Sequence, residues 1–190
     1  MLKPPVLVCL ALAGALASGS AMRASSDDRQ TAPAPGAQIL VLETAKGVIE
    51  IEVYPTDAPK SLAHVMNLIK INFYRGQRFH WVQPGVIQFG DPQSRDMTKL
   101  DDWGKGGSGR PIGVAEPSKR QFVRGSVGVA YRTGATPQSA DSQIFILRAP
   151  NPALNGKYAS IGRVSKGLDV VDKIEMRDVI KNVTVKTAAK

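Results

Sequence analysis

Residues 79–92 read Phe79-His80-Trp81-Val82-Gln83-Pro84-Gly85-Val86-Ile87-Gln88-Phe89-Gly90-Asp91-Pro92. Aromatic and β-branched residues dominate this stretch up to Gly90, which predicts a strand-like chain from 79 to 90. The residues from 91 to 113 are polar and rich in glycine, so they predict a long loop. A loop of that length in a compact domain is typically functional or mobile, which makes this region a candidate for function.

Six further segments have strand patterns, at 39–44, 48–54, 126–131, 143–147, 158–164 and 179–185. The first two flank Ala45-Lys46-Gly47 and predict a hairpin with one buried face. Segment 56–60 carries a capping residue and an early proline before apolar residues at helical spacing, and a short second helix is expected at 168–174. Many strands with only two helices predict a mainly β antiparallel barrel or sandwich.

The first 21 residues have the pattern of a secretory signal peptide, with a charged start, a short apolar stretch and then small residues. The apolar stretch is shorter than the roughly 20 residues that a spanning helix needs, so we expect cleavage and no stable membrane insertion. Residues 22–37 are polar and proline-rich and predict a disordered linker before a folded domain at 38–190. We therefore expect a periplasmic or secreted protein. Cys9 is the only cysteine, so the mature chain is expected to contain none.

The formal net charge of +9 would suit an anionic partner. Lysine and arginine are spread along the sequence without a dense run, however, so we interpret the excess as a generally basic surface and expect no nucleic-acid partner. The sequence lacks phosphate-loop, dinucleotide-binding and zinc-protease motifs and has two histidines. We expect a monomer that uses no cofactor and no metal.

Six short motifs occur in order along the chain. They are Ala58-Pro59-Lys60, Phe79-His80-Trp81-Val82, the run from Val86 to Pro92, Ser142-Gln143-Ile144-Phe145-Ile146, Leu154-Asn155-Gly156-Lys157-Tyr158 and Ile161-Gly162-Arg163-Val164. In this order and spacing they resemble the cyclophilin family of peptidyl-prolyl isomerases, from about Gln38 to Ile174. The resemblance implies a closed antiparallel β-barrel of about eight strands, capped by two α-helices. It also implies proline-containing polypeptides as partners.

The chemistry of that family is rotation about the bond that precedes proline. Amide resonance gives this bond a barrier of about 18–20 kcal/mol, whereas its cis and trans forms differ by only about 0.5–1 kcal/mol. An apolar pocket that grips the proline ring, with a guanidinium that hydrogen-bonds the prolyl nitrogen, would favour the twisted transition state over the planar one.

The resemblance also implies site residues. Trp81 and Gln88 take the catalytic positions, with Gln88 orienting the substrate backbone or the catalytic cation. The implied substrate-binding residues are Val86, Ile87, Ala130, Phe145, Leu154 and Tyr158. The stretch 79–91 is one residue shorter than is usual in the family, so the sequence leaves open which of Val86 and Ile87 faces the proline. Without the resemblance, alternating apolar residues of this kind would be interpreted as core.

Trp81 stands where the family has its catalytic arginine. Indole has one neutral N–H donor, whereas guanidinium has five donors and a fixed charge. A neutral donor cannot give the same charge stabilisation, so reduced activity is expected. Arg132, which follows Ala130-Tyr131, and Arg95 in the long loop are candidate surrogate cations, although solvated surface cations are the commoner role for such residues.

The first hypothesis is a peptidyl-prolyl cis-trans isomerase that assists folding of exported proteins by acting on Xaa–Pro bonds of unfolded or exposed segments. Uncatalysed exchange of these bonds takes tens to hundreds of seconds. The alternative is a non-catalytic module or holdase chaperone that binds proline peptides on an isomerase scaffold, and Trp81 is its best support. A third hypothesis, a basic barrel that binds nucleic acid or an anionic surface, lacks an aromatic stacking platform.

Overall fold

The computed structural model describes residues 32–132 and 134–189, so the predicted signal peptide and most of the predicted linker lie outside the described residues. The strands are β1 (Gln38–Thr44), β2 (Val48–Val53), β3 (Trp81–Gln83), β4 (Val86–Phe89), β5 (Ser126–Val129), β6 (Ile144–Leu147), β7 (Ala159–Lys166) and β8 (Ile180–Thr187). The helices are α1 (Pro59–Lys70) and α2 (Leu168–Lys173), and short 3-10 helices η2 (Pro92–Arg95), η3 (Met97–Asp102), η4 (Pro137–Ser139) and η5 (Pro152–Leu154) lie in the loops. In the part of the chain described, neither α-helix has the length and apolar character that a bilayer crossing requires.

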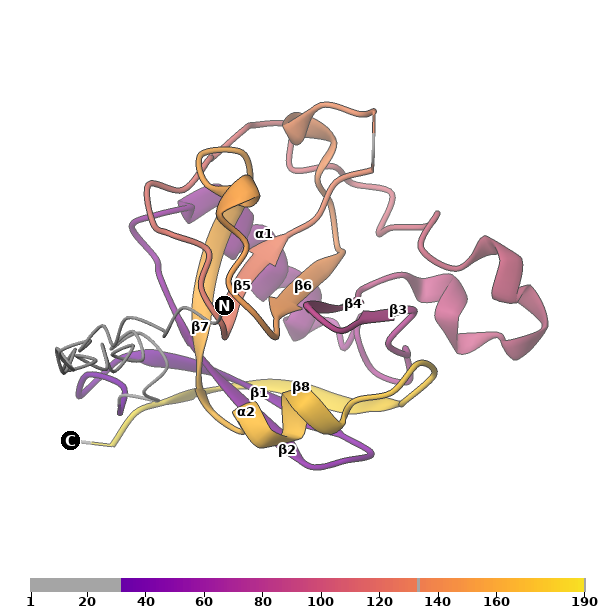
Figure 1. Cartoon of the computed structure of the whole chain (residues 1–190), viewed down its shortest axis with the longest axis horizontal. Helices are drawn as coiled ribbons and strands as arrows, with labels where there is room; N and C mark the ends of the chain where they lie inside the picture. Colours follow the sequence, from indigo (N-terminus) through magenta and orange to yellow (C-terminus); the bar gives the residue numbers. More distant parts are fainter. Residues whose placement is uncertain (1–31, 133, 190) are drawn as a thin grey trace, which may run out of the picture.

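The strands form one antiparallel sheet in the order β3-β4-β6-β5-β7-β2-β1-β8, curved into a half-barrel (Figure 1). The predicted closed barrel is wrong, because β3 and β8 are the two ends of the sheet and no ladder joins them in the described ranges. β3 has only three residues because Pro84 and Gly85 turn the chain immediately after Gln83, and residues 79–80 before it have no regular structure. A strand this short cannot support a continuous ladder on its second edge.

The two ends of the sheet nevertheless meet at a seam, which we define as the contact between residues 76–79 and 177–180. Arg78 and Val179 form an isolated antiparallel bridge there. Backbone hydrogen bonds on either side of the bridge link the same two segments. The open half-barrel is therefore linked at its ends only by a short patch of pairing that precedes β3 and overlaps the start of β8.

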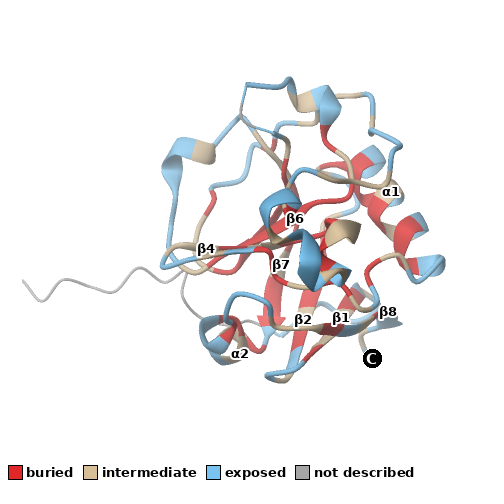
Figure 2. Cartoon of the chain, turned by 90° about the vertical axis from the view of Figure 1, so that its right-hand side faces the viewer, coloured by how far each residue is buried: buried red, intermediate tan, exposed pale blue. Residues whose placement is uncertain are grey.

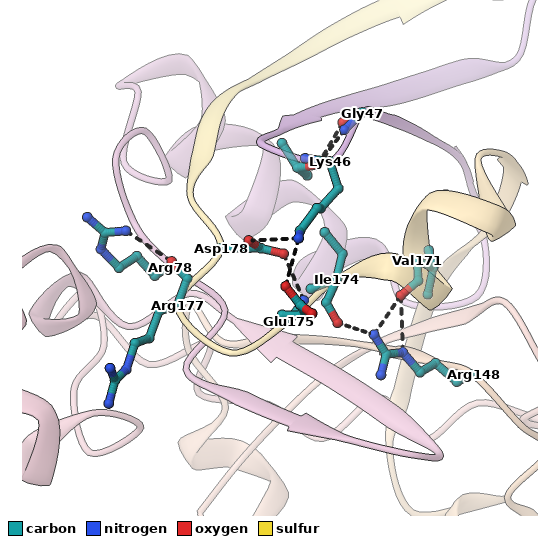
Figure 3. Close-up of polar contacts among 10 residues, drawn as sticks. Lys46, Gly47, Arg78, Arg148, Val171, Ile174, Glu175, Arg177 and Asp178 are labelled. Atoms are coloured by element: carbon teal, nitrogen blue, oxygen red, sulfur yellow. Dashed lines mark hydrogen bonds and ion pairs between the residues drawn. The ribbon is translucent and has the colours of Figure 1, made fainter.

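Side chains from elsewhere in the chain reinforce this region (Figure 3). Arg148 donates from Nε and Nη2 to the Val171 carbonyl, at 3.1 and 2.8 Å, and from Nη2 to the Ile174 carbonyl. Val171 lies in the last turn of α2, where its carbonyl also accepts the Ile174 N–H at 3.4 Å, and Ile174 is the C-cap residue that follows the helix. Lys46 pairs with Glu175 at 2.7 Å. Both cations hold the segment that leads from α2 into the seam.

The main core lies between the sheet and α1. Leu62, Val65 and Ile69 are spaced three and four residues apart, so they share one face of the helix, and all three are buried. Figure 2 shows the buried residues of α1 along one side of the helix. The strands contribute buried aliphatic and aromatic residues to the same cluster.

The start of α1 is capped by a residue that is distant in sequence. Glu116 accepts hydrogen bonds from the Lys60 N–H at 3.0 Å and from the Ser61 N–H and hydroxyl at 2.7 Å each. The predicted local cap at 56–60 is wrong, because the residue at the N-cap position is Ala58 and no side chain there makes a cap bond. Burial acts to raise the pKa of Glu116, but the hydrogen bonds outweigh burial and hold this pKa below its ordinary value of 4.5.

Stretch 79–90 forms a tight hairpin and not one continuous strand. Its two strands pair antiparallel, with Trp81 opposite Gln88 and Val82 opposite Ile87. Successive strand residues face opposite sides of a sheet. Ile87 is therefore fully buried in the main core, while its neighbours on β4 face the other way.

Candidate active site

A groove of about 1080 Å³ lies on the face of β4 and β6 that is turned away from the main core, and the loop from Trp103 to Pro111 forms one of its walls. A second apolar cluster makes its floor. The buried members are Phe122, Ala130, Phe145 and Leu147, and the partly buried ones are Val86, Leu154 and Tyr158. All of these except Phe122 line the groove. The floor suits a small apolar ring.

Contacts between aromatic rings fix the shape of the floor. Tyr158 stands edge-on to Phe145, with ring centroids 5.6 Å apart, and Phe122 packs against Phe145 at 5.7 Å. Tyr131 stacks on Tyr158 at 4.6 Å. Burial raises the pKa of Tyr158, and Tyr131 adds to this effect, so the Tyr158 hydroxyl is protonated at neutral pH. The groove therefore has a rigid aromatic end with an uncharged hydroxyl.

Gln88 is held in place by a second glutamine. Its Nε2 donates to Gln143 Oε1 at 2.6 Å. Gln143 Nε2 in turn donates to the carbonyls of Gly104 and Gly106, at 2.9 and 2.7 Å. Gln143 is thus a positioning residue that connects the amide of Gln88 to the wall across the groove.

Two carboxylates hold that wall. Asp91 is fully buried and accepts hydrogen bonds from the N–H groups of Gly104 and Gly106, at 2.6 and 3.1 Å. Asp141 accepts from the Gly109 N–H at 3.0 Å. A Cβ atom at Gly107 would lie 2.6 Å from Asp141 Oδ2, and one at Gly106 would collide with Asp91. The wall is therefore main chain pressed against carboxylates, with no room for side chains at these two glycines.

Trp81 lies at the rim of the groove with 47% of its surface exposed. It is directly opposite Gln88 in the β3–β4 pair, and opposite residues have their side chains on the same face. The preceding residue, His80, is buried, and burial lowers its pKa, so its ring is neutral at neutral pH. Neither side chain places a fixed positive charge beside Gln88.

Most of the predicted site residues come together in this groove. Those that line it are Trp81, Val86, Gln88, Ala130, Arg132, Phe145, Leu154 and Tyr158. Ile87 does not: the prediction that it binds substrate is wrong, because strand alternation turns it into the core, and Val86 is the residue of that pair that faces the groove. Arg95 is also wrong as a surrogate cation. Its guanidinium donates to the Arg75 and Phe73 carbonyls and does not line the groove.

Arg132 and Lys105 are cations of the groove lining. Lys105 pairs with Asp102 at 3.1 Å. Arg132 is exposed and forms no ion pair with any residue that the structure describes. Within residues 32–132 and 134–189, no histidine, cysteine, aspartate or glutamate side chains gather in threes as metal ligands would.

Sequence reasoning missed several parts of the groove. They are Trp103, Lys105, Tyr131, Asp141, Gln143, Leu147 and the backbone of the wall glycines. Gln143 belongs to the motif at 142–146, so the sequence indicated its place near the site. The sequence did not indicate that its side chain connects Gln88 to the wall. Phe122, beneath the floor, gives no signal, because it lies in a loop without periodicity.

Comparison with solved structures first defines the class of fold. A cyclophilin type peptidyl-prolyl cis-trans isomerase of Cryptosporidium parvum matches with a TM-score of 0.69 and 24% identity, over 79% of this chain and 98% of that one. A second structure of the same protein, in the presence of the dipeptide Ala-Pro, matches with a TM-score of 0.67. The half-barrel with two helices is therefore a cyclophilin-like fold.

Comparison of sequences is more specific. The family model for cyclophilin type peptidyl-prolyl cis-trans isomerases matches residues 39–190. A probable peptidyl-prolyl cis-trans isomerase of Brucella abortus is 38% identical over 180 residues, which are 93% of this chain and 87% of the relative. Peptidyl-prolyl cis-trans isomerase B of Bacillus subtilis is 34% identical over 139 residues, 72% of this chain and 90% of the relative. This chain belongs to the cyclophilin-type peptidyl-prolyl cis-trans isomerase family.

Proposed function

We propose that the chain accelerates cis-trans exchange of Xaa–Pro bonds in unfolded or exposed segments of exported proteins, in the periplasm or outside the cell. The observation that carries the proposal is the groove, in which an apolar floor around Phe145 lies beside the anchored amide of Gln88. The names of the curated relatives support the activity. The Ala-Pro dipeptide named with the Cryptosporidium structure supports the ligand class. The signal-peptide pattern of the first 21 residues supports export.

The mechanism needs no covalent step. Twisting the prolyl bond removes amide resonance, so the nitrogen gains a lone pair that a hydrogen-bond donor can contact. A donor that makes this contact only in the twisted state lowers the barrier. The Trp81 N–H is a neutral donor at the groove rim, and Arg132, which forms no ion pair with a described residue, adds a positive charge to the same groove. Gln88, held by Gln143, would fix the substrate backbone while the other side of the bond turns.

A second candidate function is favoured by one observation. Trp81 presents a large exposed indole where a charged donor would give more catalysis, and exposed aromatic surface binds peptides well. On this reading, the chain holds proline segments without accelerating their exchange. The two functions differ in rate and not in affinity.

The decisive experiment measures cis-trans exchange of a short Xaa–Pro peptide by NMR exchange spectroscopy, using the chain from residue 22 onward. We expect the wild type to accelerate exchange and Trp81→Arg to accelerate it further, by on the order of 100-fold, the typical contribution of a preorganised donor. Val48→Arg is the matched control, because Val48 is also exposed but lies outside the groove. Its exchange rate should equal that of the wild type.

Phe145→Ala removes the floor and should abolish both binding and exchange. If the wild type binds the peptide with the affinity of Trp81→Arg yet leaves exchange at the uncatalysed rate, the chain is a binder and the isomerase proposal fails. If Phe145→Ala exchanges the peptide as well as the wild type does, the groove is not the site.

A further inference from the structure

The seam gathers arginines that are far apart in the sequence. Arg95 Nε donates to the Arg75 carbonyl at 3.0 Å, and Arg78 Nη1 donates to the Arg177 carbonyl at 3.0 Å. The backbone N–H of Arg78 donates to Ser94 Oγ at 2.9 Å, which attaches η2 to the seam. Figure 3 shows the Arg78 and Arg177 side chains on the same side of the turn. Four arginines from three separate segments thus share one end of the molecule.

These charges are not neutralised. Among the described residues, none of the four arginines forms an ion pair. The acidic groups nearby in the chain are engaged by other cations: Asp96 lies 3.9 Å from Lys99, and Glu175 and Asp178 both contact Lys46. The excess positive charge at the seam is therefore available to a partner.

Apolar side chains are exposed in the same segments. Ile71, at the end of α1, is 67% exposed, Met176 beside Arg177 is 49% exposed, and Met97 just after η2 is 41% exposed. They are three of the six large apolar side chains that the described residues leave exposed. We name this set the seam surface, which consists of Ile71, Arg75, Arg78, Arg95, Met97, Met176 and Arg177.

We propose that the seam surface docks the protein on a membrane of anionic phospholipids. Arginines that lack acidic partners suit lipid phosphates, and flanking methionine and isoleucine side chains suit the boundary between headgroups and acyl chains. Nucleic acid fits less well, because bases bind on exposed aromatic rings, and the Arg95 guanidinium already lies over one face of the half-buried Phe73 ring, at 5.8 Å. The attachment is peripheral and does not depend on isomerase activity.

The test measures cosedimentation of the chain from residue 22 onward with two kinds of vesicle. One kind contains phosphatidylglycerol and phosphatidylcholine in equal parts, and the other contains phosphatidylcholine alone. Starting at residue 22 keeps the apolar stretch of the predicted signal peptide out of the bilayer. We expect binding to the anionic vesicles only, and we expect it to weaken as salt rises, because salt screens the attraction.

Arg75→Gln with Arg177→Asn should weaken this binding by on the order of 30-fold, since each basic residue near an anionic surface contributes about fivefold. Asn tolerates the positive φ of 78° at residue 177. The matched control, Lys119→Gln with Lys166→Gln, removes the same charge from exposed positions outside the seam and should weaken binding by less than about threefold. Thermal unfolding of each variant confirms that it is folded.

Equal binding to both kinds of vesicle would overturn the proposal, because no anionic lipid would then be required. An equal loss in the control variant would also overturn it, by showing that total charge and not the seam surface is responsible. If a single-stranded oligonucleotide binds while the anionic vesicles do not, the partner is a nucleic acid and the lipid assignment is wrong.

Discussion

At the scale of single residues, Trp81 and Gln88 lie opposite each other across β3 and β4, and Trp81 is the residue that the family resemblance places at the position of the catalytic arginine. The indole N–H can donate one neutral hydrogen bond, and the neighbouring His80 is neutral because burial lowers its pKa. Positive charge in the groove must therefore come from the other cations of its lining, Lys105 and Arg132. Lys105 pairs with Asp102, so Arg132, which forms no ion pair with a described residue, is the candidate.

Replacing Arg132 with glutamine should lower kcat/KM for an Xaa–Pro peptide by roughly three- to tenfold. The effect is smaller than that of a preorganised donor because the side chain is exposed to water. Peptide affinity should change little, since the apolar floor is untouched. The measurement is exchange rate against peptide concentration, with Lys119→Gln as the control of equal charge. An unchanged kcat/KM in Arg132→Gln would leave the neutral donors as the only source of catalysis.

The residues of the groove were largely predictable because the family resemblance carries them in short motifs, such as the one that holds Phe145. The resemblance does not show whether Val86 or Ile87 faces the groove, because stretch 79–91 is one residue shorter than is usual in the family. In the structure, the pairing of β3 with β4 places Ile87 in the core. Arg95 failed for a different reason. A cation in a loop can reach backbone carbonyls on either side of it, and only the fold shows which it meets.

At the scale of elements, periodic patterns predicted the hairpin of β1 and β2 and both helices, whose bounds agree within a few residues. The cap of α1 was not predictable, because Glu116 lies 55 residues from Ser61 in the sequence. The local sequence at 56–60 contains a residue that commonly caps helices. The acceptor that caps α1 is instead Glu116, which is brought to the helix by the tertiary fold.

Glu116→Gln should lower the free energy of unfolding by about 0.5–1 kcal/mol at neutral pH, in the lower range for caps because the site is partly exposed. The pKa of Glu116 is held below 4.5 in the folded state, so its contribution is present in full above that pH and is lost as pH falls from about 4.5 through the folded value. Urea unfolding at several pH values measures both effects. The difference between wild type and variant should shrink below pH 4.5; a constant difference down to low pH would show that the carboxylate is not the cap.

At the scale of the whole molecule, the sheet is a half-barrel whose ends are joined by a short patch of pairing at the seam. Periodicity predicted an antiparallel sheet but took 79–90 as one strand, and the count of about eight strands came from the family resemblance. Neither predicted this opening, because closure depends on how long β3 is. Charged side chains compensate for the missing ladder. Arg148 binds the end of α2 and also donates to the Gln83 carbonyl at 3.3 Å, so it spans from α2 to β3.

Arg148→Met keeps the aliphatic part of the side chain and removes these hydrogen bonds. Because it removes the Arg148 donors from the Val171 and Ile174 carbonyls, of which only Val171 keeps a backbone donor, the variant should lose about 2 kcal/mol of stability. For a domain of this size that corresponds to a decrease in Tm of roughly 4–8 °C. Differential scanning calorimetry measures it, with Lys157→Met at an exposed position as the control. A Tm within about a degree of the wild type would show that the hydrogen bonds of Arg148 do not stabilise this region.

Part of the groove wall is glycine main chain, and this affects how the site can change during evolution. Asp91 and Asp141 hold its amides, and Gly106 and Gly107 leave no space for a Cβ atom. A side chain at either glycine would push a carboxylate out of these hydrogen bonds, so substitution there disturbs the wall. Changes in ligand preference arise more readily at exposed side chains of the groove lining, such as Trp81 and Arg132, which can be exchanged one at a time.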